Sequence, residues 1–310
     1  MSYRDSMLVL STVRCSNRCT FCAYHNDVEH ITKNIPSTDD MIKQTEEFIR
    51  EKQGAIEKNK ELYIVNSGSF FSPQIRKDYM HWLSDLLKDK DWGLVVDCRA
   101  DSKLEKYSQE IADLVDVTQT LTISLGLEVA DNEILKILNK GCTLEQYVRQ
   151  AQKIKSHGAK TKAYILINPP LFGYSKDEHY RENIDKAIER AFQTAKFSID
   201  YMDAGRIGLS PFFPYKGLLI PDNWFPISAT ESAEVANQMR QAFPGIKIDY
   251  TSRQIHFAFG NFFKIKNKEK PIDAKDREQV LRGREHVAEI CKKVLGKRGK
   301  ISKSFGKRYS

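Results

Sequence analysis

Three cysteines in the stretch RCSNRCTFCAYH (14–25) have the spacing of a metal-binding loop. Cys15, Cys19 and Cys22 fall within eight residues, and His25 follows three positions later. Thiolates spaced by four and three residues can converge on one metal centre from a short loop. Six cysteines in 310 residues do not make a disulfide scaffold, and a tight cluster in a reducing compartment binds metal more often than it is oxidised. The sequence therefore predicts a metal site on these three cysteines.

Three kinds of site are compatible with this loop. Buried cysteines without a ligand would be an uncommon accident at such spacing. A structural zinc ion would need His25 as its fourth ligand, but structural zinc loops usually draw their ligands from two separated pairs. An iron–sulfur cluster usually has four cysteine ligands. Here Cys98, Cys142 and Cys291 show no shared spacing that would supply the fourth. A cluster on three thiolates keeps one iron open, which points to catalysis.

Strand-like apolar runs alternate with amphipathic helical runs along most of the chain. The predicted strands are 7–12, 61–68, 93–100, 121–128, 161–170 and 206–213, and the predicted helices between them are 37–53, 76–90, 103–115, 132–140, 144–158 and 180–198. This alternation predicts an α/β fold with a parallel sheet, open or rolled into a barrel. Functional loops follow the carboxyl ends of strands in such folds, and the cysteine loop follows the first strand.

The pattern changes after Phe213. We expect a proline-containing loop at 214–226, a helix at 228–243, a strand at 247–252 and a helix at 276–295. The chain is thus divided into a barrel domain (1–213), a C-terminal α/β extension packed on the barrel (214–295) and a basic tail (296–310).

Composition and charge indicate a globular protein without a membrane helix. Hydrophobic residues make up 41% and charged residues 29% of the chain, which is an ordinary globular balance. No apolar run reaches the roughly 18 residues of a membrane helix, and MLVL (7–10) is too short for a signal peptide, so we expect a cytoplasmic protein without a membrane partner. The net charge is +8, and residues 292–310 contain many lysines and arginines but no acid. This favours RNA as a partner, although a solvated tail without a partner is the alternative.

The C-x3-C-x2-C motif, with Phe21 before its last cysteine and a predicted strand in front of it, resembles the signature of radical S-adenosylmethionine enzymes. The resemblance implies a partial (β/α)6 TIM-like barrel and a [4Fe–4S] cluster on Cys15, Cys19 and Cys22. It also implies that S-adenosylmethionine binds the open iron. Reduction by an electron donor such as ferredoxin or flavodoxin then yields methionine and a 5′-deoxyadenosyl radical, which abstracts hydrogen from the substrate.

Further segments match lesser motifs of this family. NSGSF (66–70) follows the second strand, where small residues let the backbone approach a charged ligand, although most such turns are only turns. Glu128 ends the fourth strand, where the family often has a carboxylate that bonds the ribose; its alternative is a solvent-facing residue. INPP (167–170) resembles the segment that contacts adenine. The cofactor-binding residues implied are Phe21, Ser67, Gly68, Ser69, Arg99, Glu128 and Asn168.

Within the family, CRAD (98–101) resembles a segment in the radical subunit of Elongator, and the stretch 126–147 resembles the same subunit and, more closely, RaSEA, the radical subunit of archaeosine synthase. IVNSGSFF (64–71) and GLSPFFPYKG (208–217) also resemble segments of RaSEA. The resemblance implies a lyase for tRNA modification that cleaves the C–N bond of a lysine-bearing 7-deazaguanine to form archaeosine, with a transferase partner subunit. The first alternative is a radical enzyme acting on a small molecule or a protein, and the second is a non-catalytic, zinc-binding RNA-binding protein.

Other polar residues are candidates for substrate contacts, with structural ion pairs as their alternative. Tyr24 and His25 flank the cysteine loop, where His25 is either a donor to the cluster or an ordinary loop residue. Cys98 and Cys142 are either reactive thiols or small core residues, and free cysteines are usually the latter. The candidate substrate contacts are Asn66, Arg99, Asp101 and Lys140.

Overall fold

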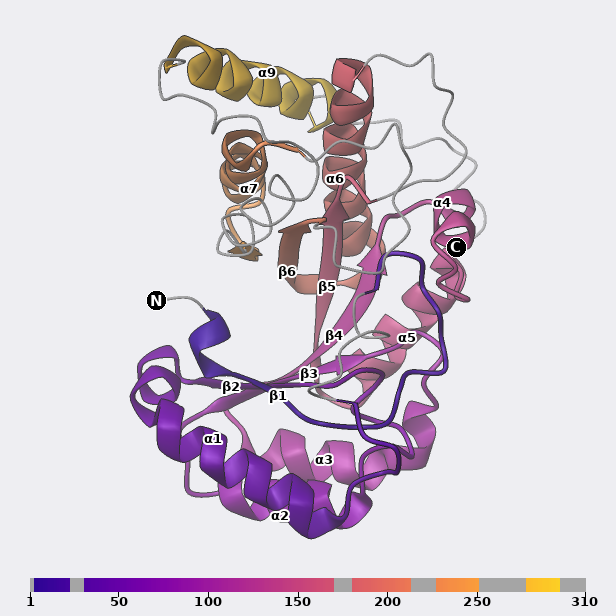
Figure 1. Cartoon of the computed structure of the whole chain (residues 1–310), viewed down its shortest axis with the longest axis vertical. Coiled ribbons are helices and arrows are strands. Elements are labelled where there is room, and N and C mark those ends of the chain that lie inside the picture. Colours follow the sequence, from indigo (N-terminus) through magenta and orange to yellow (C-terminus); the bar gives the residue numbers. More distant parts are fainter. Residues whose placement is uncertain (1–2, 23–30, 170–179, 213–226, 251–276, 296–310) are drawn as a thin grey trace.

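The computed structural model describes residues 3–22, 31–169, 180–212, 227–250 and 277–295 (Figure 1). The predicted loop 214–226, the tail 296–310, and the side chains of Tyr24 and His25 lie outside the described residues. In the part of the chain that the structure covers, every helix is too short or too polar to cross a lipid bilayer.

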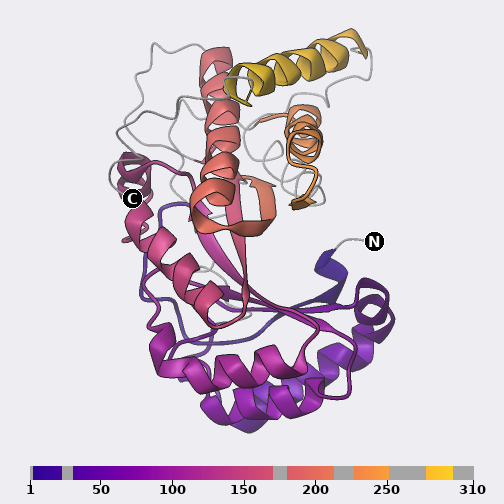
Figure 2. The ribbon, with the colours of Figure 1, turned by 180° about the vertical axis from the view of Figure 1, so that it is seen from behind.

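Seven strands form one parallel sheet, in which they lie in the order of the chain. The sheet curls into a half-barrel with helices on its outer face (Figures 1 and 2), which confirms the predicted partial TIM-like barrel. The last strand lies in the segment expected to pack on the barrel, but it pairs in parallel with the sixth strand and continues the sheet. The strands are β1 (Met7–Val9), β2 (Glu61–Val65), β3 (Gly93–Cys98), β4 (Leu121–Glu128), β5 (Lys160–Ile167), β6 (Ala204–Pro211) and β7 (Lys247–Tyr250).

The predicted helices are present, with shifted ends. The first runs beyond the predicted end at residue 53, because the buried side chain of Ile56 holds the turn that follows Gly54. Ser37 caps it: the Ser37 hydroxyl accepts a hydrogen bond from the backbone amide of Asp40. The helices are α1 (Thr38–Asn59), α2 (Lys77–Leu87), α3 (Ser108–Val117), α4 (Asn132–Ile137), α5 (Leu144–Ser156), α6 (Tyr180–Met202), α7 (Ala229–Ala242) and α9 (Arg277–Leu295), with 3-10 turns η1 (Tyr3–Ser6) and η3 (Leu104–Tyr107).

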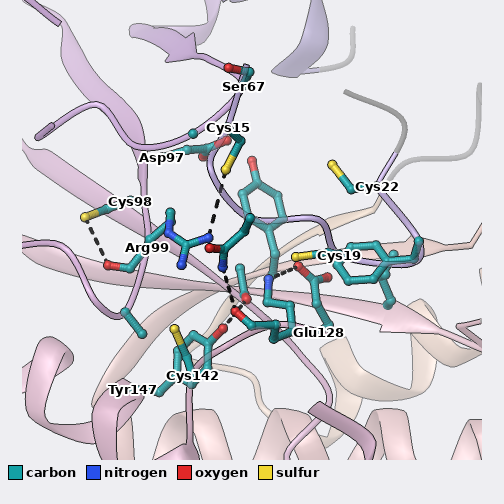
Figure 3. Close-up of a pocket in the computed structure, with 18 of the residues that line it drawn as sticks. Cys15, Cys19, Cys22, Ser67, Asp97, Cys98, Arg99, Glu128, Cys142 and Tyr147 are labelled. Carbon is teal, nitrogen blue, oxygen red and sulfur yellow. Dashed lines mark hydrogen bonds and ion pairs between the residues drawn. The ribbon is translucent and has the colours of Figure 1, made fainter. Parts of the chain in front are cut away.

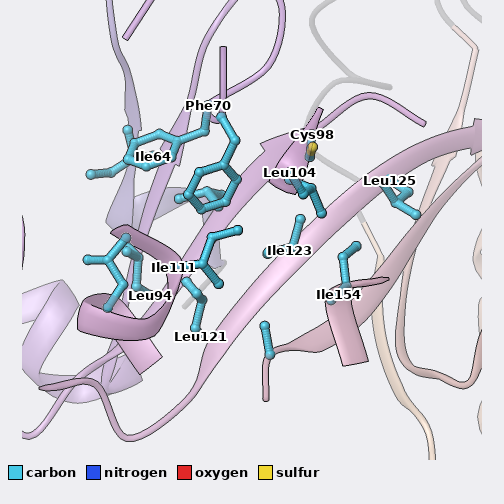
Figure 4. Close-up of a cluster of buried hydrophobic side chains, with 14 of the residues drawn as sticks. Ile64, Phe70, Leu94, Cys98, Leu104, Ile111, Leu121, Ile123, Leu125 and Ile154 are labelled. Carbon is cyan, nitrogen blue, oxygen red and sulfur yellow. The ribbon is translucent and has the colours of Figure 1, made fainter. Parts of the chain in front are cut away.

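The two faces of the sheet differ in polarity. On the outer face, Leu94, Ile123 and their neighbours form an apolar core against the helices (Figure 4). Side chains alternate between the faces of a strand, so the residues between these positions face the interior of the half-barrel. Asp97 and Ser124 are two such interior residues, and they lie opposite each other in the register of β3 and β4. The interior is therefore polar.

A second apolar cluster holds the C-terminal helices in place. Phe192 of α6, Met239 of α7 and Ile290 of α9 are buried together with residues of β5 and β6. This packing sets α7 and α9 beside α6, away from the first three helices (Figure 2).

An ion network, formed by Glu61, Tyr63, Lys162, Arg206 and Asp249, fills the interior near the amino ends of the strands. Arg206 donates to Glu61 (Nη1–Oε1, 2.6 Å) and to Asp249 (Nε–Oδ2, 2.6 Å). Lys162 donates to the same Asp249 oxygen at 2.7 Å, and its ammonium lies over the Tyr63 ring. The network links β2 to β5, β6 and β7 across the interior, so it closes this end of the half-barrel.

Candidate functional site

The three cysteines of the predicted metal site line one cavity at the carboxyl ends of the strands (Figure 3). The cavity has a volume of about 220 Å³. Its wall comes from the cysteine loop, from the carboxyl ends of β3, β4, β5 and β6, from the turns after β2 and β3, and from the segment after α4 with the start of α5. This is the edge of a parallel sheet at which ligands bind.

Hydrogen bonds from a distant segment hold the cysteine loop. Residues 17–20 of the loop contact residues 138–140, which follow α4. The bonds run from Asn17 Nδ2 to Lys140 O (2.8 Å), from Asn139 Nδ2 to Arg18 O (2.8 Å) and from Thr20 N to Leu138 O (3.0 Å). The loop therefore has a defined position although it has no regular secondary structure.

The other side of the cysteine loop is fixed by the segment after β2. Ser67 Oγ donates to the carbonyl oxygen of Val13 at 2.6 Å, and Gln74 Nε2 donates to that of Arg14 at 3.2 Å. Two side chains thus hold the backbone directly before Cys15.

The thiols differ in their surroundings. Cys19 is buried, which raises the pKa of its thiol, although the nearby Lys140 ammonium acts in the opposite direction. Arg99 Nη1 lies 4.0 Å from Cys15 Sγ and donates to it. None of the cysteines in the described residues forms a disulfide bond. The Lys140 ammonium thus offsets part of the effect that burial has on the Cys19 thiol.

The chemistry of the donor set fits an iron–sulfur cluster. No three His, Cys, Asp or Glu side chains of the described residues, a set that lacks His25, lie close enough together to hold one metal ion. The three cysteines are instead spread around a shared cavity. Soft sulfur donors at the edge of such a cavity suit an iron–sulfur cluster.

Five of the seven predicted cofactor-binding residues line the cavity. They are Phe21, Ser67, Gly68, Arg99 and Glu128. Ser69 does not line it: its hydroxyl bonds Cys98 Sγ (3.3 Å) and Ser102 Oγ (2.8 Å). Asn168 is buried at the end of β5, in the left-handed backbone region (φ 57°), and is not part of the cavity wall either. The binding roles of all seven residues stay predictions.

Glu128 and Lys140 form a buried ion pair in the cavity wall. Lys140 Nζ lies 3.1 Å from Glu128 Oε1 and 5.3 Å from the centre of the Phe21 ring. Burial lowers the pKa of Lys140, but Tyr147, Glu128 and Cys19 together raise it, so Lys140 is charged. Glu128 itself has φ 67° at an irregularity in the β4–β5 register. Lys140 thus joins the predicted ribose-binding carboxylate to the cysteine loop.

Arg99 and Asp101 pair with each other. Arg99 donates to both carboxylate oxygens of Asp101, at 2.8 Å from Nε and 2.6 Å from Nη2. Asn66 and Lys140 also line the cavity, whereas Asp101 is not part of its wall. The ion-pair alternative considered for these residues therefore holds for Arg99 with Asp101 and for Lys140 with Glu128.

Several wall residues were not predicted as site residues. Cys98 and Cys142 are buried, as expected for small core residues, yet both line the cavity. Asp97 lines it too, and its Oδ1 atom is buried and has no hydrogen-bond partner among the residues that the structure describes. A carboxylate within the apolar strand GLVVDC (93–98) was the available signal for Asp97. Burial raises its pKa to about 7.

Comparisons with known proteins agree with this site. Residues 9–187, more than half of the chain, match the Radical SAM superfamily. Archaeosine synthase subunit beta of Thermococcus kodakarensis is 25% identical over 254 residues, which cover 78% of this chain and 74% of that protein. This agrees with the predicted resemblance to archaeosine synthase.

Two solved structures share the fold. Methylornithine synthase (PylB) aligns with a TM-score of 0.50 at 12% identity, over 96% of this chain and 84% of its own. Streptococcus suis SuiB bound to S-adenosylmethionine aligns with a TM-score of 0.52 at 12% identity, over 79% of this chain and 50% of its own. With its cysteine motif at the carboxyl edge of a parallel half-barrel, the chain is an enzyme of the radical S-adenosylmethionine superfamily.

Proposed function

We propose that Cys15, Cys19 and Cys22 hold a [4Fe–4S] cluster and that the adjoining cavity binds S-adenosylmethionine. The single observation that carries this proposal is the position of the three thiols, which line one cavity with Ser67, Gly68 and Glu128. Membership of the superfamily implies the same two cofactors. When bound, they supply a 5′-deoxyadenosyl radical that abstracts a hydrogen atom from the substrate.

The side chains of the cavity would bind and orient these groups. The Glu128 carboxylate would accept hydrogen bonds from ribose hydroxyls, while its ion pair with Lys140 holds it in place. Gly68 and the small Ser67 leave the backbone accessible to the charged methionyl end of the cofactor. Phe21 presents an apolar face near the adenine. Arg99, beside Cys15, supplies positive charge next to a cluster ligand.

The substrate proposed is a modified base in tRNA. The similarity to archaeosine synthase subunit beta supports cleavage of the C–N bond of a lysine-bearing 7-deazaguanine. The word subunit in that name supports a partner protein, which we propose to be a transferase that attaches the lysine. The net charge of +8 favours a polyanion. A ferredoxin or flavodoxin would supply the electron.

The cluster proposal is tested by anaerobic reconstitution with iron and sulfide. We expect a brown protein with about four irons per chain, absorbance near ~400 nm, and release of 5′-deoxyadenosine on addition of dithionite and S-adenosylmethionine. Cys19→Ala should lose the iron and the absorbance. Cys291→Ala is the matched control, because Cys291 is buried between helices in the second apolar cluster and should keep both. A colourless wild-type protein with one zinc per chain would contradict the proposal.

The substrate proposal is tested on tRNA nucleosides. Mass spectrometry of tRNA from cells with and without this protein should show archaeosine only in its presence and the lysine-bearing precursor in its absence. Unchanged tRNA nucleosides, with intact cleavage of S-adenosylmethionine by the purified protein, would favour the alternative of a small-molecule or protein substrate.

A further inference from the structure

Asp97 is a cavity residue for which the proposed cofactors give no role. It lies on β3 in the wall that the three cysteines also line. Within the described part of the chain, its Oδ1 atom makes no hydrogen bond and its carboxylate forms no ion pair. The cation that faces it is Lys162, whose ammonium is bonded to Asp249 at 2.7 Å.

A second oxygen beside Asp97 also lacks a partner. Ser124 is the register neighbour of Asp97 on β4; it is not part of the cavity wall, and its buried hydroxyl makes no hydrogen bond of ordinary length within the described residues. The amide oxygen of Asn66, elsewhere in the cavity wall, is likewise buried and unpaired. Buried polar atoms are nearly always satisfied, so unpaired oxygens around a cavity indicate a ligand that brings donors.

The charges that face Asp97 favour a cation as this ligand. Burial raises the pKa of Asp97 to about 7; Lys162 on β5 and Ser124 lower it, and Glu128 on β4 raises it. The Lys162 ammonium pairs with Asp249 in the ion network, so it does not form a direct ion pair with Asp97. A positively charged group entering the cavity would stabilise the ionised carboxylate.

We infer that Asp97 binds a protonated amine of the substrate. An ammonium group offers several N–H donors and a positive charge, which suit the unpaired carboxylate oxygen of Asp97 in the cavity wall. A neutral hydroxyl offers a single donor and no charge. The identity of the amine rests on the proposed function: in a lysine-bearing base, it is the free amino group of the lysine. Asp97 would thus select amine-bearing substrates inside the cavity where the radical forms.

The first test uses the reconstituted holoenzyme with two tRNA probes, one carrying the lysine-bearing base and one in which its amine has been acetylated. For the wild type, acetylation should lower kcat/KM for substrate-dependent release of 5′-deoxyadenosine by about 10–100-fold. Asp97→Asn should show the same loss with the unmodified probe, through KM, and no further loss on acetylation. Asp89→Asn, an exposed substitution, is the matched control and should behave as the wild type.

The second test does not depend on the identity of the substrate. Isothermal titration of the holoenzyme with S-adenosylmethionine bound compares pentane-1,5-diamine with pentane-1,5-diol. The diamine should bind the wild type and Asp89→Asn about 10-fold tighter than the diol, and Asp97→Asn should bind both equally. The preference should weaken from pH 8 to pH 6, because Asp97 takes up a proton while the amines stay charged.

The outcomes separate this inference from the proposed function. If neither tRNA is turned over, the proposed substrate is wrong, and the diamine comparison decides the role of Asp97. Equal binding of diamine and diol by the wild type would overturn the inference. So would an Asp97→Asn variant that keeps the wild-type preference, or one that loses kcat with KM unchanged.

Discussion

Two aspartates face the interior of the half-barrel in opposite electrical surroundings. Asp249, near the amino ends of the strands, accepts hydrogen bonds from Lys162 and Arg206. Burial alone would raise its pKa, but these two cations outweigh it and hold the pKa below its usual value. Asp97 has no such partner, and burial raises its pKa to about 7. The ionised form is thus strongly stabilised at Asp249 and only weakly stabilised at Asp97.

The difference separates a structural end from a functional end of one interior. Asp97, Ser124, Lys162 and Arg206 are successive partners in the strand register, so the ion network directly adjoins the cavity. On the network side, each charge has an opposite charge beside it, as a stable fold requires. On the cavity side, polar atoms stay unpaired, as expected where a ligand completes the site. Substitutions on the two sides should therefore change stability in opposite directions.

The largest loss of folding stability is expected for a substitution in the ion network. Asp249→Asn removes the carboxylate shared by Lys162 and Arg206 and leaves two buried cations with insufficient negative charge. Breaking a buried pair in this way costs about 3–5 kcal/mol. Urea unfolding of the apoprotein should show this loss.

The control for this experiment is an exposed ion pair. Asp91 lies 3.3 Å from Lys60 with 62% of its side chain exposed, so Asp91→Asn should leave the urea midpoint almost unchanged. If Asp249→Asn is no more destabilising than Asp91→Asn, the ion network does not stabilise the fold and the comparison fails.

The opposite sign is expected for Asp97→Asn. Well below pH 3.8, the carboxyl is protonated in both the folded and the unfolded state and has no effect on stability. As the pH rises from 3.8 to about 7, the unfolded state releases the proton first, so the free energy of unfolding of the wild type falls. This loss is at most about 4 kcal/mol above pH 7, and water in the cavity reduces it.

Asparagine cannot ionise, so the variant should be more stable than the wild type at pH 8 and similar to it at pH 4. Urea unfolding of the apoprotein at both pH values measures the difference. If Asp97→Asn is less stable than the wild type at pH 8, the Asp97 carboxylate stabilises the fold, as Asp249 does, and the comparison fails.

The local part of this architecture could be predicted from the sequence. The bounds predicted for β4 agree with the structure at both ends, because an apolar run stops at a carboxylate. The cysteine loop and Glu128 lie where motif and strand order place them, in one cavity. The first helix extends past its predicted end because tertiary burial of Ile56 outweighs the weak helix propensity of Gly54.

The non-local part could not be predicted. Arg206 and Glu61 are 145 residues apart in the chain, and only the strand register and the curl of the sheet bring them together. For the same reason, no local pattern distinguishes Asp97, which is unpaired, from Asp249, which is paired. The change of pattern after Phe213 predicts an extension packed on the barrel, whereas the pairing of β7 with β6 depends on the register of the whole sheet.

A smaller loss of stability is expected for Gly208→Ala, at the boundary between the ion network and the cavity. A Cβ atom on Gly208 would lie 2.4 Å from Cδ1 of Tyr164 and 2.9 Å from Cε of Lys162, so the tyrosine ring needs glycine at this position. Gly208→Ala should cost about 1–3 kcal/mol of stability in urea unfolding. Gly205→Ala on the same strand has nothing within 4 Å of its new Cβ and is the control. Equal stabilities of the two variants would show that Tyr164 can move aside.

The smallest change in free energy is expected for Lys140→Met, which alters the affinity of the cavity for S-adenosylmethionine. The variant removes the ammonium group that pairs with Glu128 and lies over Phe21, while the methionine fills a similar volume. Glu128 then loses the ion-pair partner that holds its carboxylate in place, so its hydrogen bonds to ribose should weaken. The affinity of the reconstituted enzyme for S-adenosylmethionine should fall about 10-fold, or ~1.4 kcal/mol. Equilibrium binding measures this, with Lys136→Met, exposed on α4, as the control.

The iron content of Lys140→Met should stay constant, because the backbone carbonyl of Lys140 that anchors Asn17 is retained. If Lys140→Met loses iron but binds S-adenosylmethionine normally, the lysine positions the cysteine loop and not Glu128.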